Sequence, residues 1–259
     1  MTLSKVSSIK SIKTVIILVI FISVISWAFS GIDFSIDKVT DGLPHLVDFL
    51  RDLYPPDLSV APTLFQSAIE TIQMVIAGTV LGTVLAFPMA AMASTNIAPK
   101  FMALIIRTLL MIIRTIPSLV WALIFVITVG LGPFSGVLAL TFYTVGYLGK
   151  LYYEVIESID ADTLEGVVAV GANNTQIFIH AIIPQLVPHI VNNFFFMIDY
   201  NIRHATILGL VGAGGIGFYL FLYLQSFNLD KVAMALLIVL LLVIGFDRLS
   251  LEVRKKLIQ

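Results

Sequence analysis

Long apolar runs divide this chain into six segments, and short polar stretches separate them. The runs lie at about 14–30, 63–94, 101–129, 134–157, 181–207 and 229–247. A helix rises about 1.5 Å per residue, so about 20 residues cross the hydrocarbon of a bilayer. The pattern predicts an all-α integral membrane protein with about six transmembrane helices.

Composition agrees with a membrane environment. Of the 259 residues, 59% are hydrophobic and 12% are charged, whereas soluble domains average about 25% charged residues. Lipid accepts apolar surface that a soluble fold would have to hide. The formal net charge of -1 and the lack of a basic face argue against a nucleic-acid partner. The absence of cysteine excludes disulfides, thiolate metal sites and cysteine nucleophiles.

Lysine and arginine are distributed unevenly between the two sides of the predicted membrane protein. With six crossings, one side carries Lys5, Lys10, Lys13, Lys100, Lys150, Arg248, Arg254, Lys255 and Lys256. The other side carries Lys38, Arg51 and Lys231, and its first loop is rich in aspartate. Basic residues favour the cytoplasmic side. We therefore expect a multi-pass protein of a bacterial inner (plasma) membrane with both termini in the cytoplasm.

We expect two regions. Residues 1–62 form an N-terminal transmembrane helix and an external segment, and residues 63–259 form a core of five transmembrane helices with a cytoplasmic loop at about 158–180. Ala28, Phe29 and Ser30 before Gly31 imitate a signal-peptidase site, so cleavage of the first apolar segment remains an alternative.

The cytoplasmic loop has helical character that is interrupted at Gly171. Asp162 or Thr163 is a candidate cap for a short helix, and the stretch that begins at Gly171 would end it with a left-handed turn. A short helix between two spans gives another protein a surface to bind, through which its motion can reach the spans. With Pro184 at the start of the next span, such motion would tilt the spans.

This loop resembles the EAA loop of ABC importer permeases. Gly171 follows Glu165 by six residues, and Pro184 follows Gly171 by thirteen. The chain departs from the family pattern at Gly166 and Val167, where two alanines are usual, and also at Ala181 and Ile183. The resemblance implies that Glu165, Gly166, Gly171, Ala172 and Pro184 couple the chain to an ATPase.

Further stretches resemble the phosphonate-type permeases, whose transmembrane domain has the MetI-like type I fold. They are RTIPSLVWALIFV at 114–126, VGLGPFSGVLAL at 129–140, LGKLYYEVIE at 148–157 and NIRHATILGLVGAGGIG at 201–217. The resemblance implies a homodimeric permease, two ATP-binding subunits and an extracytoplasmic binding protein that delivers phosphonate, phosphite or a related phosphorus oxyanion. The chain itself has no phosphate-binding loop for ATP, so ATP and Mg would bind to a partner subunit and this chain would be no enzyme.

Several residues are candidates for the translocation path. Gly212, Gly214 and Gly215 could cradle an anion with backbone N–H groups, although close packing is the stronger interpretation. Charges at membrane depth are costly and usually functional, which singles out Arg114, Asp199 and Arg203. We expect Asp199 and Arg203 to pair, since they are four residues apart, and Arg107 to reach lipid headgroups.

Other functions have less support from the sequence. The spacing of His180, His189 and His204 does not suit a metal site, and no serine, histidine and aspartate pattern suggests an enzyme. A methionine or osmolyte permease is an alternative in the same fold. An ion channel is the alternative from another class, but no selectivity loop is evident.

Overall fold

The computed structural model describes residues 3–32, 35–159 and 171–257, and it separates into two compact units, Met1–Arg51 and Asp52–Gln259. In the first unit, α1 (Leu3–Ser30) contains a stretch, Lys13–Ser30, that is long and apolar enough to cross a membrane. All of its side chains from Lys13 onward are exposed. An apolar stretch of this length is long enough for the hydrocarbon of a bilayer.

The predicted external segment contains a helix, α2 (Ile36–Asp52). Its apolar residues recur at the three- and four-residue intervals that place them on one helical face: Ile36, Val39, Leu43, Leu46, Val47 and Leu50. The aspartates of this stretch occupy other positions, so α2 is amphipathic.

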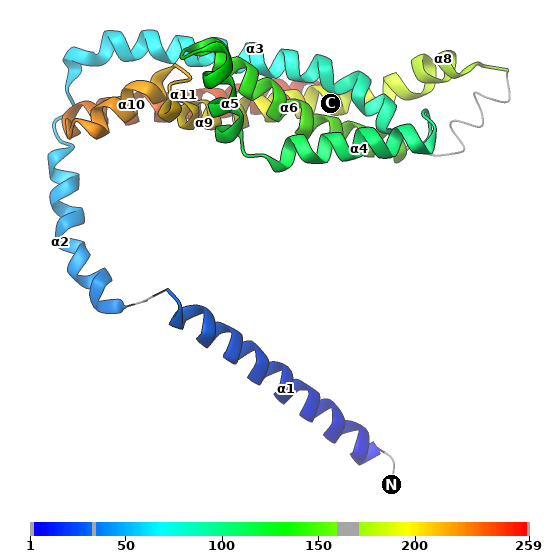
Figure 1. Ribbon diagram of the computed structural model, residues 1–259, viewed down its shortest axis with the longest axis horizontal. Helices are drawn as coiled ribbons and strands as arrows, with labels where there is room; N and C mark the ends of the chain where they lie inside the picture. Colours follow the sequence, from blue (N-terminus) through cyan, green and yellow to red (C-terminus); the bar gives the residue numbers. More distant parts are fainter. Residues whose placement is uncertain (1–2, 33–34, 160–170, 258–259) are drawn as a thin grey trace. The chain divides into compact units, whose positions relative to one another are not determined.

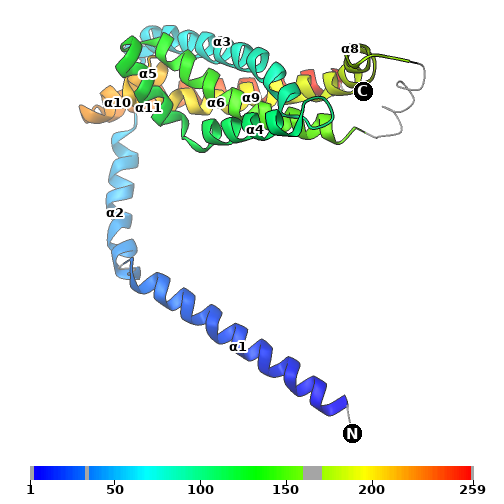
Figure 2. The ribbon, with the colours of Figure 1, turned by 45° about the vertical axis from the view of Figure 1, so that its right-hand side comes forward.

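The second unit is a bundle of long helices, and no strand occurs in the parts of the chain that are described. Figures 1 and 2 show α3, α6, α9 and α11 side by side along its length. The elements are η1 (Leu58–Val60), α3 (Ala61–Ala93), α4 (Lys100–Thr115), α5 (Ser118–Val129), α6 (Pro133–Glu157), α8 (Asn174–Ile177), a π-helical turn (Phe178–Ile182), α9 (Ile183–Leu208), η3 (Gly209–Val211), α10 (Ile216–Gln225) and α11 (Leu229–Leu257).

Small residues bring α3 and α6 into close contact. A Cβ atom on Gly78 would lie 2.7 Å from Cβ of Leu140, and one on Gly82 would lie 2.5 Å from Cβ of Thr144. The two glycines are four residues apart and therefore share one face of α3. This is the small-residue spacing that lets membrane helices approach closely.

The six predicted segments are all helical. Four of the described helices, α1, α3, α9 and α11, belong to stretches that are long and apolar enough to cross a membrane, and α4 with α5 would make a fifth span. The sixth segment, α6, is 25 residues long, but many of its buried residues are small or polar, among them Ser135, Thr141 and Thr144. Because protein rather than lipid covers this face, it does not need to be strongly apolar.

The run at 101–129 differs from one continuous helix. The chain bends by 89° between α4 and α5, and the break falls at Ile116 and Pro117. Proline disfavours helical geometry in the residue before it, and Ile116 accordingly has extended backbone angles, φ -77° and ψ 121°.

The bundle has two ends with different chemistry (Figure 1). We call the end with residues 94–99, 158–159 and 171–177 the loop end. The opposite end, with residues 130–132 and 209–217, is the glycine end. The candidate residues fall at these two ends and along the helices between them.

Candidate functional site

The glycine end binds a carboxylate of its own chain. The backbone nitrogen of Gly215 donates a hydrogen bond to Oε1 of Glu70 at 2.9 Å, and that of Ile216 donates to Oγ1 of Thr71 at 2.9 Å. These donors lie at the start of α10, where an anion is favoured. Glu70 therefore occupies an amide donor that an anionic substrate would need.

The three glycine candidates lie together at this end. Gly212, Gly214 and Gly215 have positive φ angles of 81°, 81° and 71°. They line a pocket of about 280 Å³, together with Glu70 and the neighbouring residues Leu131, Gly132, Pro133, Phe218 and Tyr219. A Cβ on Gly215 would lie 2.5 Å from Oγ1 of Thr71. Both the backbone angles and the close approach therefore require glycine here.

Arg114 lies at the end of α4, just before the bend, and its side chain is exposed. A groove of about 250 Å³ between α4 and α6 is lined by Arg107, Arg114 and Lys150. Arg107 and Arg114 share this groove, as their spacing of seven residues predicts. Among the described residues, no ion pair or hydrogen bond of the Arg114 side chain is found, so its charge faces the groove without a carboxylate.

Asp199 and Arg203 form the predicted ion pair within α9. Nη2 of Arg203 lies 3.1 and 3.0 Å from the two carboxylate oxygens of Asp199. The side chain of Arg203 is 52% exposed, whereas that of Asp199 is 13% exposed. The pair is local to one helix, and no hydrogen bond or ion pair joins it to Arg114 in the described part of the chain.

A row of aromatic side chains joins α6 to α9, and the sequence interpretation missed it. Tyr143 donates a hydrogen bond to the hydroxyl of Tyr200 at 3.0 Å. The ring of His204 stacks on Tyr200 with centroids 4.4 Å apart, and its Nδ1 lies 2.7 Å from Oγ of Ser118 at the start of α5. Tyr147 and Phe196 extend the stack. The signal was the four-residue spacing of 143 with 147 and of 196, 200 and 204.

We call Ser118, Tyr143, Tyr147, Phe196, Tyr200 and His204 the aromatic face. Its aromatic and imidazole rings are all half-buried in the single chain. Hydroxyl and imidazole groups at membrane depth are costly against lipid. This face is therefore expected to meet protein or water.

Beside the aromatic face, Asn201 connects three helices. Its Nδ2 donates hydrogen bonds to Oγ1 of Thr79 on α3 and to Oγ1 of Thr144 on α6, both at 2.9 Å. Asn201 is fully buried. Polar side chains of this kind hold membrane helices in register.

At the loop end, the described residues include three of the five coupling candidates. Glu165 and Gly166 lie outside the described residues, as does the helix predicted from 162 onward. Gly171 has a φ of 84°, which confirms the left-handed conformation predicted for it. Ala172 is half-buried, and Pro184 lies in the first turn of α9.

A capping box follows Gly171 and was not predicted. The backbone nitrogen of Asn173 donates to Oε1 of Gln176, and that of Gln176 donates to Oδ1 of Asn173, both at 2.9 Å. This reciprocal pair satisfies two backbone donors at a helix start. Gly171 is thus the turn that precedes a well-capped helical segment leading into α9.

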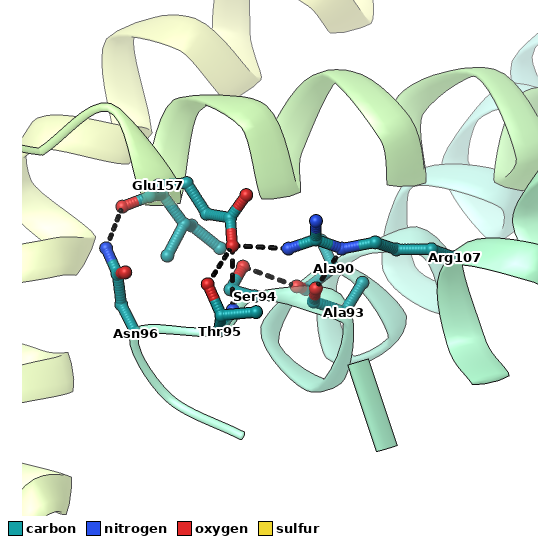
Figure 3. A network of polar contacts seen from close by, with 8 residues as sticks. Ala90, Ala93, Ser94, Thr95, Asn96, Arg107 and Glu157 are labelled. Carbon is teal, nitrogen blue, oxygen red and sulfur yellow. Dashed lines mark hydrogen bonds and ion pairs between the residues drawn. The ribbon is translucent and has the colours of Figure 1, made fainter. Parts of the chain in front are cut away.

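A polar network at the same end ties α3, α4 and α6 together (Figure 3). Glu157, the last residue of α6, accepts hydrogen bonds from the backbone nitrogen of Thr95 at 2.8 Å and from the Thr95 hydroxyl. It also forms an ion pair with Arg107 of α4. Nε of Arg107 donates to the carbonyl oxygen of Ala93 at 2.8 Å. The expectation that Arg107 reaches lipid headgroups is therefore wrong, because its guanidinium is bound within the bundle.

Comparison with known sequences gives a clear family match. Residues 78–257 match the family described as "Binding-protein-dependent transport system inner membrane component". A phosphite transport system permease protein of Stutzerimonas stutzeri, PtxC, is 37% identical over 216 residues, which cover 83% of this chain and 78% of that protein. The phosphate-import permease protein PhnE of Mycolicibacterium smegmatis is 33% identical over 236 residues, which cover 91% of this chain and 44% of that protein.

A solved structure has the same fold. The chain resembles the MetNI methionine ABC transporter in an inward-facing conformation, with a TM-score of 0.69 and 18% sequence identity. The match covers 78% of this chain and 100% of that chain. At this identity the likeness establishes the fold, the MetI-like arrangement that the sequence predicted.

Proposed function

Since this chain belongs to the family of inner membrane components of binding-protein-dependent transport systems, we propose that it is the permease of an ABC importer for a phosphorus oxyanion. Phosphite, phosphonate and phosphate are the substrates in question. The observation that carries the proposal is the 37% identity to a phosphite permease over 83% of this chain. The phosphate-import relative adds a second oxyanion of the same shape and charge class.

ATP hydrolysis belongs to two partner subunits in this proposal, and a binding protein outside the membrane delivers the substrate. ATP and Mg bind to those subunits. The segment from Glu165 to Pro184 contacts them, with Gly171 as the turn that passes their motion to α9. Both termini and the loop end then lie in the cytoplasm, in agreement with the bias of lysine and arginine.

A second copy of the chain completes the pore. The aromatic face supports this arrangement, because hydroxyl and imidazole groups are costly against lipid. Facing a partner copy, these groups would border a path with many weak hydrogen-bond donors. Weak donors suit a conduit, since a tight site would retain the anion that it must release.

Arg114 supplies the positive charge that an oxyanion needs near this path. Its guanidinium is exposed and lies just before the bend that leads to Ser118 of the aromatic face. Arginine can offer two donors to two oxygens at once. Asp199 and Arg203 neutralise each other and are assigned to the wall of the path. Gly212, Gly214 and Gly215 form the outer constriction of the path at the glycine end. There the carboxylate of Glu70 accepts a hydrogen bond from the backbone N–H of Gly215.

The test is growth of the source cell on single phosphorus sources. A strain without this chain should fail to grow on low concentrations of one phosphorus oxyanion, and the restored chain should return growth. Labelled uptake of phosphite, methylphosphonate and phosphate identifies the substrate. Unchanged uptake of all three, with loss of methionine or choline uptake, would contradict the proposal and favour the alternative permeases.

A further inference from the structure

The network at the loop end joins the ends of α3 and α6 to the middle of α4 (Figure 3). We propose that Thr95, Arg107 and Glu157 form a clamp that makes the ends of α3 and α6 and the middle of α4 move as one body. This inference rests on the proposed function, since it concerns how the push of an ATPase reaches the spans. The three are positioning residues.

Two of the contacts satisfy carbonyl oxygens that helix ends leave without partners. Nε of Arg107 donates to the carbonyl of Ala93, the last residue of α3, at 2.8 Å. Nδ2 of Asn96 donates to the carbonyl of Ile156, in the last turn of α6, at 3.2 Å. The final carbonyls of a helix have no partner within it. Each helix end is therefore capped by a side chain from another part of the chain.

Glu157 is the common acceptor of the clamp. Its Oε1 receives the Thr95 amide, the Thr95 hydroxyl and the Arg107 guanidinium. Hydrogen bonds to an ionised carboxylate are about twice as strong as those between neutral groups. The side chains of Arg107 and Glu157 are 31% and 25% exposed, so water screens their contact less than it screens a pair on an open surface. The guanidinium of Arg107 also lies over the ring of Tyr153, with its carbon 4.8 Å from the ring centroid.

The position of the clamp determines which helices receive motion from the loop end. Glu157 is the last residue of α6, directly before the predicted cytoplasmic loop, so motion that enters α6 from that loop reaches the clamp first. Through Thr95 the motion reaches the turn after α3, and through Arg107 it reaches α4, whose far end carries Arg114 and the bend. Without the clamp, motion of the predicted cytoplasmic loop would pass directly only to α6 and α9, the two helices that it joins.

The chain offers a matched control on the same helix. Lys150 and Glu154 form an ion pair at 3.2 Å, but both belong to α6. Glu154→Gln removes a carboxylate one turn before Glu157 without releasing another helix. It controls for loss of charge near the membrane surface.

The test uses the purified complex of permease, ATPase subunits and binding protein in proteoliposomes. Parent, Glu157→Gln, Arg107→Gln, the double variant and Glu154→Gln are compared for ATPase retention, ATP hydrolysis and uptake. We expect both single variants to retain the ATPase and hydrolyse ATP within about twofold of the parent. The ATP consumed per substrate moved should rise roughly two- to thirtyfold. The loss in the double variant should be smaller than the sum of the two single losses, because both single variants remove the contact between Arg107 and Glu157, and Glu154→Gln should match the parent.

A second readout is independent of the substrate. Hydrogen exchange of the amides at 94–98 should respond to ATP binding in the parent and in Glu154→Gln, but not in Glu157→Gln. A clamp variant would overturn the inference if it kept both the parental ratio of ATP consumed to substrate moved and the parental change in hydrogen exchange. Additive losses in the double variant would overturn it as well. Failure of the proposed function is distinct, since the parent itself would then take up no phosphorus oxyanion.

Discussion

The backbone nitrogen of Gly215 lies 2.9 Å from Oε1 of Glu70, so a carboxylate of α3 holds the first turn of α10. The two residues are 145 positions apart in the sequence. This contact ties the start of α10 to α3 at the glycine end of the bundle. It also uses the N–H of Gly215, which is then not available to an anion. It supports the packing interpretation of the glycines over the alternative of an anion cradle.

Substitution of Gly215 tests that geometry. Gly215→Ala should destabilise the protein by about 1–3 kcal/mol, because alanine is strained at a φ of 71° and its Cβ would meet Thr71. Thermal unfolding in detergent measures the loss. Gly245→Ala on α11 is the control, since a Cβ there meets nothing within 4 Å, and it should leave the unfolding temperature the same or higher. Equal behaviour of the two variants would contradict the assigned geometry.

The buried amide of Asn201 should contribute to the stability of the core. Asn201→Ala removes hydrogen bonds to α3 and α6 and leaves a cavity, so the free energy of unfolding should fall by about 1–3 kcal/mol. Thr79→Val and Thr144→Val each remove one acceptor with little change in volume, and each should cost less. A threonine variant that costs more than Asn201→Ala would show that the network is assigned incorrectly.

Gly171 and Arg107 show how far the sequence alone leads. A glycine that ends a helical run predicts a left-handed residue from local chemistry, and Gly171 has that conformation. The pairing of Asp199 with Arg203 follows from helical spacing in the same way. Arg107 and Glu157 are 50 positions apart, and helical periodicity gives the face of a residue but not its partner on another helix. The 89° bend at Pro117 was missed because apolar residues continue on both sides of it.

The turn at Gly171 should be required for coupling but not for insertion. Gly171→Val places a β-branched residue at a φ of 84°, where it is strained, and should lower uptake at least several-fold while ATP hydrolysis continues. Gly171→Asn should be tolerated better, because asparagine adopts this conformation more readily. No atom of the described residues lies within 4 Å of a Cβ at this position, so a clash with them would not explain the effect. Parental uptake by the valine variant would remove the coupling role.

Arg114 should affect passage of the anion rather than assembly. Its side chain is exposed, so Arg114→Gln should purify as the parent does. Uptake should fall about tenfold or more, in line with loss of one charge-assisted contact, and Arg114→Lys should retain more activity. Initial uptake rates at saturating ATP measure this effect. An Arg114→Gln variant that fails to assemble would make the residue structural.

The central claim is that this chain moves a phosphorus oxyanion inward when partner subunits hydrolyse ATP. The most direct measurement is accumulation of labelled phosphite, methylphosphonate or phosphate in proteoliposomes that contain the chain, its ATPase subunits and ATP, with the binding protein on the opposite face. We predict accumulation of at least one of these anions against its gradient, dependent on ATP and on the binding protein. Accumulation of none of them by an assembled complex that hydrolyses ATP would contradict the assignment.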